Sequence, residues 1–335
     1  MQPSARAFRP PVLLRNPHVQ TMLSSGPLRQ SLVRRRARAL TAAAESVVLD
    51  AGHGVRLSGR FSPSPRLPAR GLAIVLHGWE GSTESNYVLE SSTRLHAENW
   101  DVFRLNLRDH GDSHALNHDI FHSCLIDEVV AAVGEVARRY SARPLTLTGF
   151  SLGGNFVLRV ALRAPDAGIP LAAVAAVCPA IDPEHTLAAM ERGFVYHRYF
   201  LHKWRRSLRR KQALFPDLDL LRPEDRRRGL RDLTRVMTER QTDFGTLENY
   251  LDGYCIAGQR LAGLAVPTRI LTSRDDPVIP VADLLPLADI PAIELDIAEY
   301  GGHCGFIEGG GLASFCPAYL AEWLGGFTPP HPRGA

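Results

Sequence analysis

Cysteines are few in this sequence, and they follow no pattern. The 335 residues contain five cysteines, an odd number with no C-x-x-C pair among them. Scattered thiols of this kind favour neither a disulfide framework nor a zinc knuckle, so a reducing compartment fits best. The five are Cys124, Cys178, Cys255, Cys304 and Cys316.

Long apolar runs are missing as well. Arginines and prolines interrupt residues 1–23, which therefore lack the apolar stretch of a signal peptide. No later segment is apolar for long enough to span a bilayer. We therefore expect a cytoplasmic protein.

Neither sign of charge dominates. The chain has 39 lysines and arginines against 35 aspartates and glutamates, a net charge of +4. The excess comes from local basic clusters, which are typical of solvated helix faces, so we expect no nucleic-acid partner. These clusters lie at residues 34–36, 205–206, 209–211 and 226–228. With 45% hydrophobic residues, the chain has enough apolar side chains for a sizeable core.

Regular structure is predicted to begin with two strands. Residues 45–50 and 55–61 are separated by a turn signal at 52–54, which predicts a leading antiparallel hairpin. The continuous apolar run GLAIVLHG at 71–78 is typical of a strand buried on both faces of a parallel sheet.

From residue 86 onward, helical and strand patterns alternate. Helices are predicted at 86–99, 126–140, 152–162, 282–288 and 312–324, and strands at 101–108, 144–150, 171–179, 267–273 and 292–298. This rhythm predicts an α/β protein with a mostly parallel, doubly wound sheet. It fails only at about 182–265, where the pattern is helical and rich in arginine and aromatic residues. We therefore predict one domain over residues 1–335, with its core at about 45–181 and 266–327 and a helical lid inserted at about 182–265.

A candidate nucleophile stands between a predicted strand and a predicted helix. Ser151 lies in the sequence Gly-Phe-Ser-Leu-Gly at 149–153. A sharp elbow that exposes a serine hydroxyl at a helix N-terminus needs small residues two positions before and after it, because the backbones come close there. The pattern alone arises by chance, but its place after a strand and before a helix favours a catalytic serine.

Partners for this serine follow in the chain order Ser, Asp, His that α/β-hydrolases require. Asp276 follows the next-to-last predicted core strand, and His303 follows the last one. We predict that His303 takes the proton from Ser151 and that Asp276 orients the imidazole. The adjacent Asp275 is an alternative to Asp276.

Two backbone N–H groups are candidates for an oxyanion hole. Leu152 follows the nucleophile and supplies one, and Trp79 in the loop after the 71–78 strand supplies the other. A nucleophile, a base and an oxyanion hole complete the chemistry, so neither a metal nor an organic cofactor is implied.

Four histidines spaced four apart could suggest metal ligands on one helical face. They are His110, His114, His118 and His122. Asp109, Gly111, Asp112 and Asn117 make the stretch a predicted loop instead, so we interpret these histidines as ordinary loop residues.

The predicted lid contains a basic, aromatic-rich helical segment. Residues 196–211 fit a helix that makes transient contact with a lipid surface, and equally an ordinary lid helix whose arginines keep their charged ends in water. Its aromatic residues could line an acyl pocket or merely pack the lid. They are Phe194, Tyr196, Tyr199, Phe200 and Trp204.

Taken together, these motifs resemble the α/β-hydrolase superfamily, and within it the YheT and EMB8-like branch of esterases. The resemblance covers nearly the whole chain. The motifs specific to the branch are NPHVQT at 16–21 and GGHCGF at 301–306. Asp109 departs from the glycine expected after the arginine in NLRDHGDS, which leaves the shape of that loop open.

The resemblance implies a hydrolase of carboxylic esters with lipid-like, short- to medium-chain acyl groups, acting through Ser151, Asp276 and His303. Acyl transfer to an alcohol, thioesterase and peptidase activity stay open as alternatives. A non-catalytic binding protein of the same fold is a further alternative, although such proteins usually lack a member of the triad. The expected partner is a small-molecule ester, and the sequence leaves the oligomeric state open.

Overall fold

A computed structural model describes residues 4–5, 8–141, 144–309 and 311–328. Its centre is one eight-stranded sheet in the order β1-β2-β4-β3-β5-β6-β7-β8. The strands are β1 (Glu45–Asp50), β2 (Arg56–Ser62), β3 (Leu72–Leu76), β4 (Asp101–Leu105), β5 (Leu145–Phe150), β6 (Leu171–Val177), β7 (Thr268–Ser273) and β8 (Ile293–Ala298). Within the described ranges, no helix is long and apolar enough to cross a membrane.

The pairing of the strands matches the predicted hairpin followed by a parallel sheet. β1 pairs antiparallel with β2, and β2 pairs antiparallel with β4. All the remaining neighbours are parallel. The prediction of an α/β fold with a mostly parallel sheet is thus confirmed.

The central strands are buried on both faces, as their continuous apolar sequences predict. In β3, Leu72, Ile74 and Leu76 face one apolar cluster, and Ala73 and Val75 face the other. Because side chains alternate along a strand, one apolar run supplies both sides of the core.

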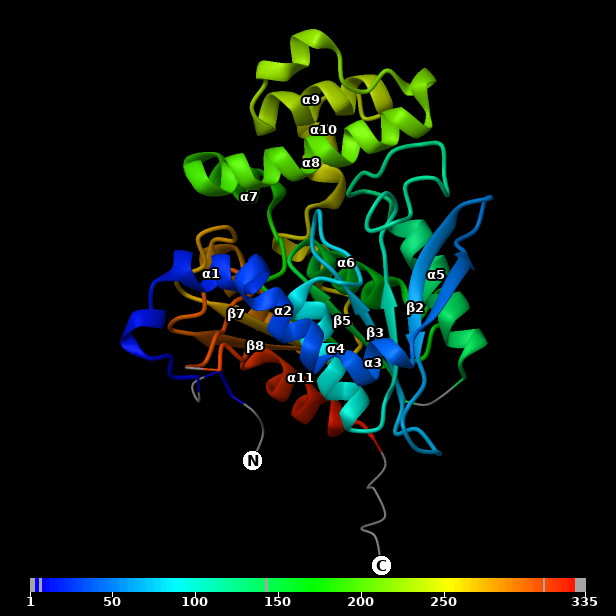
Figure 1. Cartoon of the computed structure of the whole chain (residues 1–335), viewed down its shortest axis with the longest axis vertical. Helices are drawn as coiled ribbons and strands as arrows, with labels where there is room; N and C mark the ends of the chain where they lie inside the picture. The colour runs from blue at the N-terminus through cyan, green and yellow to red at the C-terminus, as the bar shows by residue number, and fades with distance from the viewer. Residues whose placement is uncertain (1–3, 6–7, 142–143, 310, 329–335) are drawn as a thin grey trace, which may run out of the picture.

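Helices cover the two faces of the sheet (Figure 1). α5 (Ile126–Arg139) and α6 (Leu152–Arg163) pack together on one face. α4 (Asn86–Ala97) and α11 (Cys316–Gly325) pack together on the other. In α5, valines and alanines at helical spacing are buried, while acidic residues open the helix and arginines close it, which suits the helix dipole.

Three N-terminal helices add an outer layer over α4, in a region for which we made no prediction of secondary structure. They are α1 (Pro17–Ser25), α2 (Pro27–Arg36) and α3 (Arg38–Ala42). Although α2 is strongly basic, it buries Arg29, whose guanidinium pairs with the buried carboxylate of Glu90 on α4. A buried, paired charge therefore contributes to this contact.

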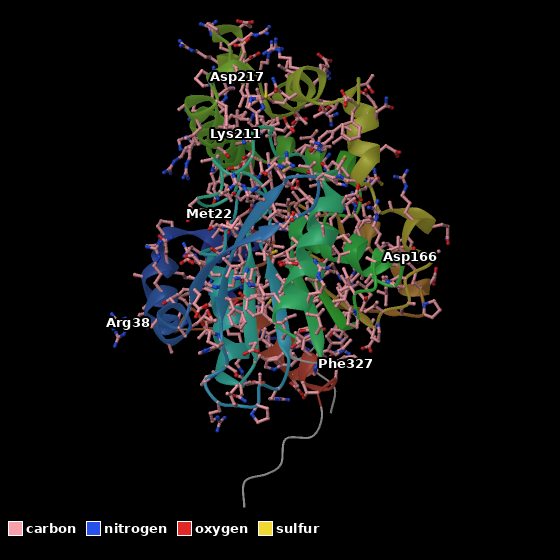
Figure 2. All side chains as sticks on the ribbon, turned by 90° about the vertical axis from the view of Figure 1, so that its right-hand side faces the viewer. Met22, Arg38, Asp166, Lys211, Asp217 and Phe327 are labelled. Atoms are coloured by element: carbon pink, nitrogen blue, oxygen red, sulfur yellow. The ribbon has the colours of Figure 1, made fainter. Side chains whose placement is uncertain are left out.

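Between β6 and β7, the chain leaves the sheet and forms a helical insertion. Its helices are α7 (Pro183–Arg192), α8 (Phe194–Leu214), α9 (Leu230–Gln241) and α10 (Leu247–Tyr254). They lie above one end of the sheet in Figure 1, and the labelled Lys211 and Asp217 lie in this upper layer in Figure 2, far from Phe327. The described part of the insertion contains no strand, so its helical character agrees with the prediction.

Three predicted elements differ from the structure by three residues or more. The strand predicted at 101–108 ends at Leu105, and the helix predicted at 312–324 begins at Cys316. The helix predicted at 282–288 is replaced by two short 3-10 turns, Val281–Asp283 and Leu285–Asp289. Pro286 lacks the N–H that a continuous α-helix would need there.

Candidate active site

Ser151 lies at a strained elbow between β5 and α6. Its backbone has φ 54° and ψ −119°, a conformation that is costly for a residue with a side chain. The neighbouring glycines are required by close approach. A Cβ on Gly149 would collide with the carbonyl of Gly153, and a Cβ on Gly153 would collide with the carbonyl of His77. The Gly-x-Ser-x-Gly spacing therefore has a steric cause.

The structure brings Ser151, His303 and Asp276 together from three separate parts of the chain. Ser151 Oγ lies 2.9 Å from His303 Nε2. His303 Nδ1 lies 2.9 Å from Asp276 Oδ2 and donates to it, since a carboxylate can only accept. The serine hydroxyl is then the donor to Nε2, which is the arrangement a general base requires.

The neighbouring carboxylates have different surroundings. The side chain of Asp276 is fully buried, and its Oδ1 accepts the N–H groups of Val278 and Ile279 at 2.8 and 2.9 Å. Asp275 instead accepts the N–H of Gly302 at 2.9 Å. Asp276 is thus the carboxylate that contacts the His303 side chain, whereas Asp275 binds the backbone of Gly302, the residue before His303.

Charge and burial act in opposite directions on His303. Burial disfavours the imidazolium, but the adjacent Asp276 carboxylate outweighs burial, and the pKa of His303 lies above its usual 6.5. The histidine accepts a proton more readily than a free imidazole, and it must lose that proton before it can act as a base.

The loop after β3 passes close to Ser151. A Cβ on Gly78 would lie 3.0 Å from Ser151 Cβ, so glycine gives this loop its close approach. Trp79 follows Gly78, and Leu152 follows Ser151. Within the described part of the chain, the N–H groups of Trp79 and Leu152 donate no hydrogen bond. Their role as an oxyanion hole stays a prediction.

Two neutral histidines brace this loop. His77 donates from Nδ1 to the carbonyl of Gly78 at 2.7 Å and accepts the N–H of Leu107 at Nε2, 3.1 Å away. His110 accepts the N–H of Glu80 at Nε2, 3.0 Å away. Burial lowers the pKa of His77 to about 4 and that of His110 well below 6.5, so both Nε2 atoms stay free to accept.

Comparison with known proteins places this chain in a family. A family model, Hydrolase_4, described as serine aminopeptidase, S33, matches residues 68–296, more than half of the chain. The chain belongs to this family of α/β-hydrolases. It is a hydrolase by family.

Relatives of this hydrolase support the predicted branch. It is 29% identical to the Escherichia coli protein named "Putative esterase YheT", over 96% of this chain and 94% of that protein. It is 24% identical to embryogenesis-associated protein EMB8 of Picea glauca, over 70% of this chain and 53% of that protein. The solved Pyrococcus furiosus esterase Pf2001 shares its fold, with a TM-score of 0.58 and 16% identity over 87% of this chain and 91% of that one.

Ser151 of this hydrolase lies between two cavities. One is mainly apolar and lies under the helical insertion, with a volume of about 90 Å³. Its walls include Trp79, Leu152, Leu187, Met190, Phe200 and Trp204. The other is mainly polar, with a volume of about 360 Å³, and its walls include Ser24, Glu80, Ser85, Tyr87 and Lys203. An apolar group and a polar group can therefore reach the serine from different sides.

The sequence left open whether the aromatic residues of α8 line a pocket or only pack the insertion, and the structure shows that they differ. Phe200 stacks on Trp79 with ring centroids 5.6 Å apart, and Trp204 meets Trp79 edge-on at 5.5 Å. Both line the apolar cavity. Tyr196 is buried outside this cavity, and Phe194 is largely exposed.

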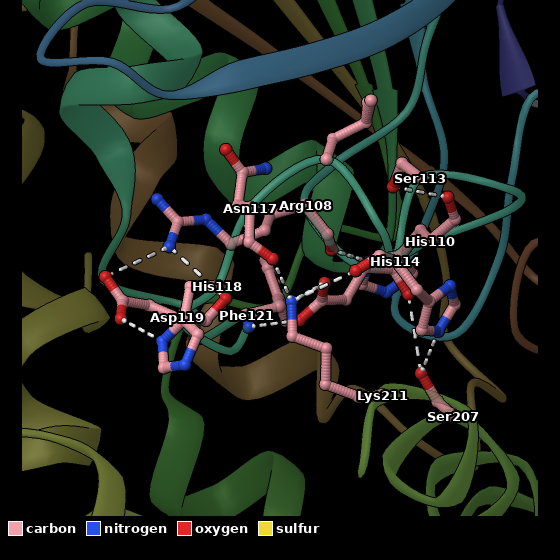
Figure 3. Close-up of polar contacts among 12 residues, drawn as sticks. Arg108, His110, Ser113, His114, Asn117, His118, Asp119, Phe121, Ser207 and Lys211 are labelled. Atoms are coloured by element: carbon pink, nitrogen blue, oxygen red, sulfur yellow. Dashed lines mark hydrogen bonds and ion pairs between the residues drawn. The ribbon is translucent and has the colours of Figure 1, made fainter. Parts of the chain in front are cut away.

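The four histidines after β4 lie in a loop and face different partners. Figure 3 labels His110, His114 and His118. His114 shares a hydrogen bond of 2.8 Å with Ser207 of α8, and His118 shares one of 2.6 Å with Asp217. His110 braces the Gly78 loop, and His122 packs edge-on against Phe244. The loop conformation agrees with the prediction.

Asp109, which departs from the expected glycine, has the left-handed conformation that glycine adopts easily, with φ 56°. Its carboxylate accepts the N–H of Phe121 and the Nζ of Lys211, each at 2.8 Å. Lys211, on α8, also donates to the carbonyl groups of His114 and Asn117 (Figure 3). An aspartate here thus ties the loop after β4 to the helical insertion.

Among the described residues, one group has a geometry that could suit a metal ion. The ligand atoms of Cys178, His303 and Cys304 lie within 4.8 Å of one another, and all three residues are buried. Burial raises the pKa of the Cys178 and Cys304 thiols, so both are protonated. Both nitrogens of His303 already have partners, so the group does not fit a resident metal.

Proposed function

We propose that this protein is a serine hydrolase that cleaves carboxylic esters through a covalent acyl-Ser151 intermediate. One observation carries the proposal: Ser151 Oγ, His303 Nε2, His303 Nδ1 and Asp276 Oδ2 form a continuous chain of 2.9 Å contacts at the wall of an apolar cavity. Such a chain activates a hydroxyl that is otherwise a weak nucleophile.

In the proposed reaction, Ser151 Oγ attacks the ester carbonyl while His303 Nε2 takes its proton. The N–H groups of Trp79 and Leu152 hold the negative oxygen of the tetrahedral intermediate. As the intermediate collapses, His303 returns the proton to the leaving alcohol. Water then attacks the acyl-serine by the same route in reverse, which releases the acid and frees Ser151.

The acyl group is proposed to occupy the apolar cavity, with the helical insertion acting as a lid. Leu187 and Met190 of α7 and Phe200 and Trp204 of α8 supply apolar surface suited to a short or medium acyl chain. A mouse relative, 21% identical over 70% of this chain and 58% of its own length, is named phospholipase ABHD3. That name agrees with a lipid-like ester as substrate.

Acyl transfer is the second candidate, favoured by the polar cavity on the other side of Ser151. Its volume of about 360 Å³ and its polar walls would admit an alcohol as well as water. Hydrolysis and transfer share the acyl-enzyme, so product analysis with an added alcohol distinguishes them. A new ester among the products would establish transfer.

The test is a panel of p-nitrophenyl esters from acetate to decanoate, assayed with the wild-type protein and with Ser151→Ala. We expect turnover by the wild-type protein, best at a short or medium chain length, and its loss in Ser151→Ala by a factor of about 10⁴ or more. Equal turnover by both proteins would refute the serine mechanism.

A further inference from the structure

The two motifs specific to the branch lie more than 280 residues apart in the sequence but touch in the structure. NPHVQT at 16–21 forms the start of α1, and Asn16 caps this helix by accepting the N–H groups of His18 and Val19. GGHCGF at 301–306 forms the turn that carries His303. The mechanism above uses the histidine of this turn but gives no role to the N-terminal motif.

Thr21 binds the backbone of His303 itself. Its Oγ1 accepts the N–H of His303 at 2.9 Å and donates to the carbonyl of Pro17 at 2.7 Å. The hydroxyl is therefore oriented by its own helix, with its lone pair directed at the histidine. His303 is buried, so its N–H has no ready replacement partner in water.

Gln20 holds the same turn four residues further on. Its amide accepts the N–H of Ile307 at 2.7 Å and donates to the carbonyl of Ile307 at 3.2 Å. The side chain is fully buried, and its Nε2 also donates to the carbonyl of Leu14 at 2.6 Å. A side-chain amide thus pairs with both polar groups of one backbone residue, as a neighbouring strand would.

The glycines of the second motif make room for this contact. A Cβ on Gly302 would lie 2.7 Å from Thr21 Oγ1, and a Cβ on Gly305 would lie 2.6 Å from the carbonyl oxygen of Gln20. Real Cβ contacts are not that short, so any other residue would push the turn away from α1. The two motifs therefore depend on each other sterically as well as through hydrogen bonds.

We propose that α1 is a clamp for the catalytic histidine, with Thr21 and Gln20 as positioning residues that fix the His303 turn against Ser151. The inference rests on the proposed function, because it gives His303 the role of base. The same helix also reaches the insertion, since His18 Nδ1 lies 2.7 Å from the Tyr196 hydroxyl of α8. One helix thus contacts both the turn that carries the base and the proposed lid.

The test compares Thr21→Val, which keeps the shape but removes the acceptor, with Thr21→Ser, which keeps the acceptor. Thr41→Val is the matched control, because Thr41 donates to the carbonyl of Ala37 one turn back in the same way but lies on α3. Each variant is labelled to completion with a fluorophosphonate, which gives the number of active sites. The rate is divided by this number, so that a loss of folded protein is not mistaken for a loss of kcat.

We expect kcat per labelled site to fall about tenfold or more in Thr21→Val, with KM within about twofold, because a misplaced base impairs the chemical step more than binding. Thr21→Ser and Thr41→Val should stay within about twofold of wild type. If Thr21→Val does not fold, Thr21→Ala removes the same acceptor without adding a methyl group and replaces it.

If Thr21→Val, or Thr21→Ala in its place, has the same kcat per labelled site as the wild-type protein, the proposed role of α1 is wrong. The serine mechanism would not be affected by that result. Failure of the wild-type protein itself to react with the fluorophosphonate would instead refute the proposed function. The two failures are therefore distinguishable in one experiment.

Discussion

Replacing Lys211 by methionine should destabilise the protein by about 3–5 kcal/mol at neutral pH, because it leaves a buried carboxylate without its charged partner. The Lys211 side chain is 1% exposed and that of Asp109 7% exposed, with 2.8 Å between Nζ and Oδ1. Methionine fills a similar volume, so the loss comes from charge and hydrogen bonding and not from a cavity. For a chain of 335 residues, the change corresponds to a fall in Tm of about 4–7 °C.

The pH dependence of this loss identifies its cause. Burial raises the pKa of Asp109 above 3.8, and Lys211 limits that rise. Without Lys211, the pKa in the folded state rises further. Near pH 4 the carboxyl is then largely protonated when folded, so the loss shrinks to the pH-independent cost of the His114 and Asn117 carbonyl groups that lose Lys211 as their donor. As the pH rises, the unfolded state releases its proton while the folded state resists, so the deficit grows toward pH 7.5.

Thermal unfolding at pH 4.5 and pH 7.5 measures this effect, with Arg210→Met as the matched control. Arg210 neighbours Lys211 on the same helix, but it is exposed and donates to the carbonyl of Gly111, so its loss should stay within about 0.5 kcal/mol. A fall of less than 2 °C in Lys211→Met, or an equal fall at both pH values, would refute the reasoning.

Two further predictions concern the site. Asp276 raises the pKa of His303 in spite of burial, so kcat/KM should rise with pH through a midpoint above 6.5. Asp276→Asn should lower that midpoint, and it should lower the plateau of kcat/KM by about 10⁴. A midpoint that does not move in the pH profile would contradict this assignment. Met190→Trp should fill part of the apolar cavity. In assays with p-nitrophenyl esters, it should lower the ratio of kcat/KM for the octanoate to kcat/KM for the acetate about tenfold. An unchanged ratio would mean that the acyl chain lies elsewhere.

The sheet and the elbow were predictable because their signals are local. β3 is a continuous apolar run, and such a run is stable only when both of its faces are covered. The glycines around Ser151 are dictated by backbone atoms within a few residues or on the adjacent strand. Patterns of this kind can be read from a single sequence.

The choice between Asp275 and Asp276 depends on atoms that sequence patterns do not locate. Both carboxylates follow β7, and they differ in the groups that they contact. The turn at Asp276 and Pro277 directs one carboxylate at His303 and the other at the N–H of Gly302. The residue preferred from the sequence is the one that contacts the histidine.

Apart from the cap of α1 at Asn16, the N-terminal helices have few local signals, and they were missed because tertiary contacts stabilise them. α2 has the sequence PLRQSLVRRR, with too few apolar residues for a clear stripe, and it buries Arg29 against Glu90. α1 is likewise held by the polar contacts of Gln20 and Thr21 with a turn at the far end of the chain. The motif NPHVQT was visible, but its partner was not.

The most direct measurement is mass spectrometry of the protein after reaction with a fluorophosphonate. The account predicts one adduct, located on the peptide that contains Ser151, with labelling that is abolished in Ser151→Ala and strongly slowed in His303→Ala. The absence of any adduct on folded wild-type protein, or an adduct that persists in Ser151→Ala, would contradict the assignment of Ser151 as the nucleophile.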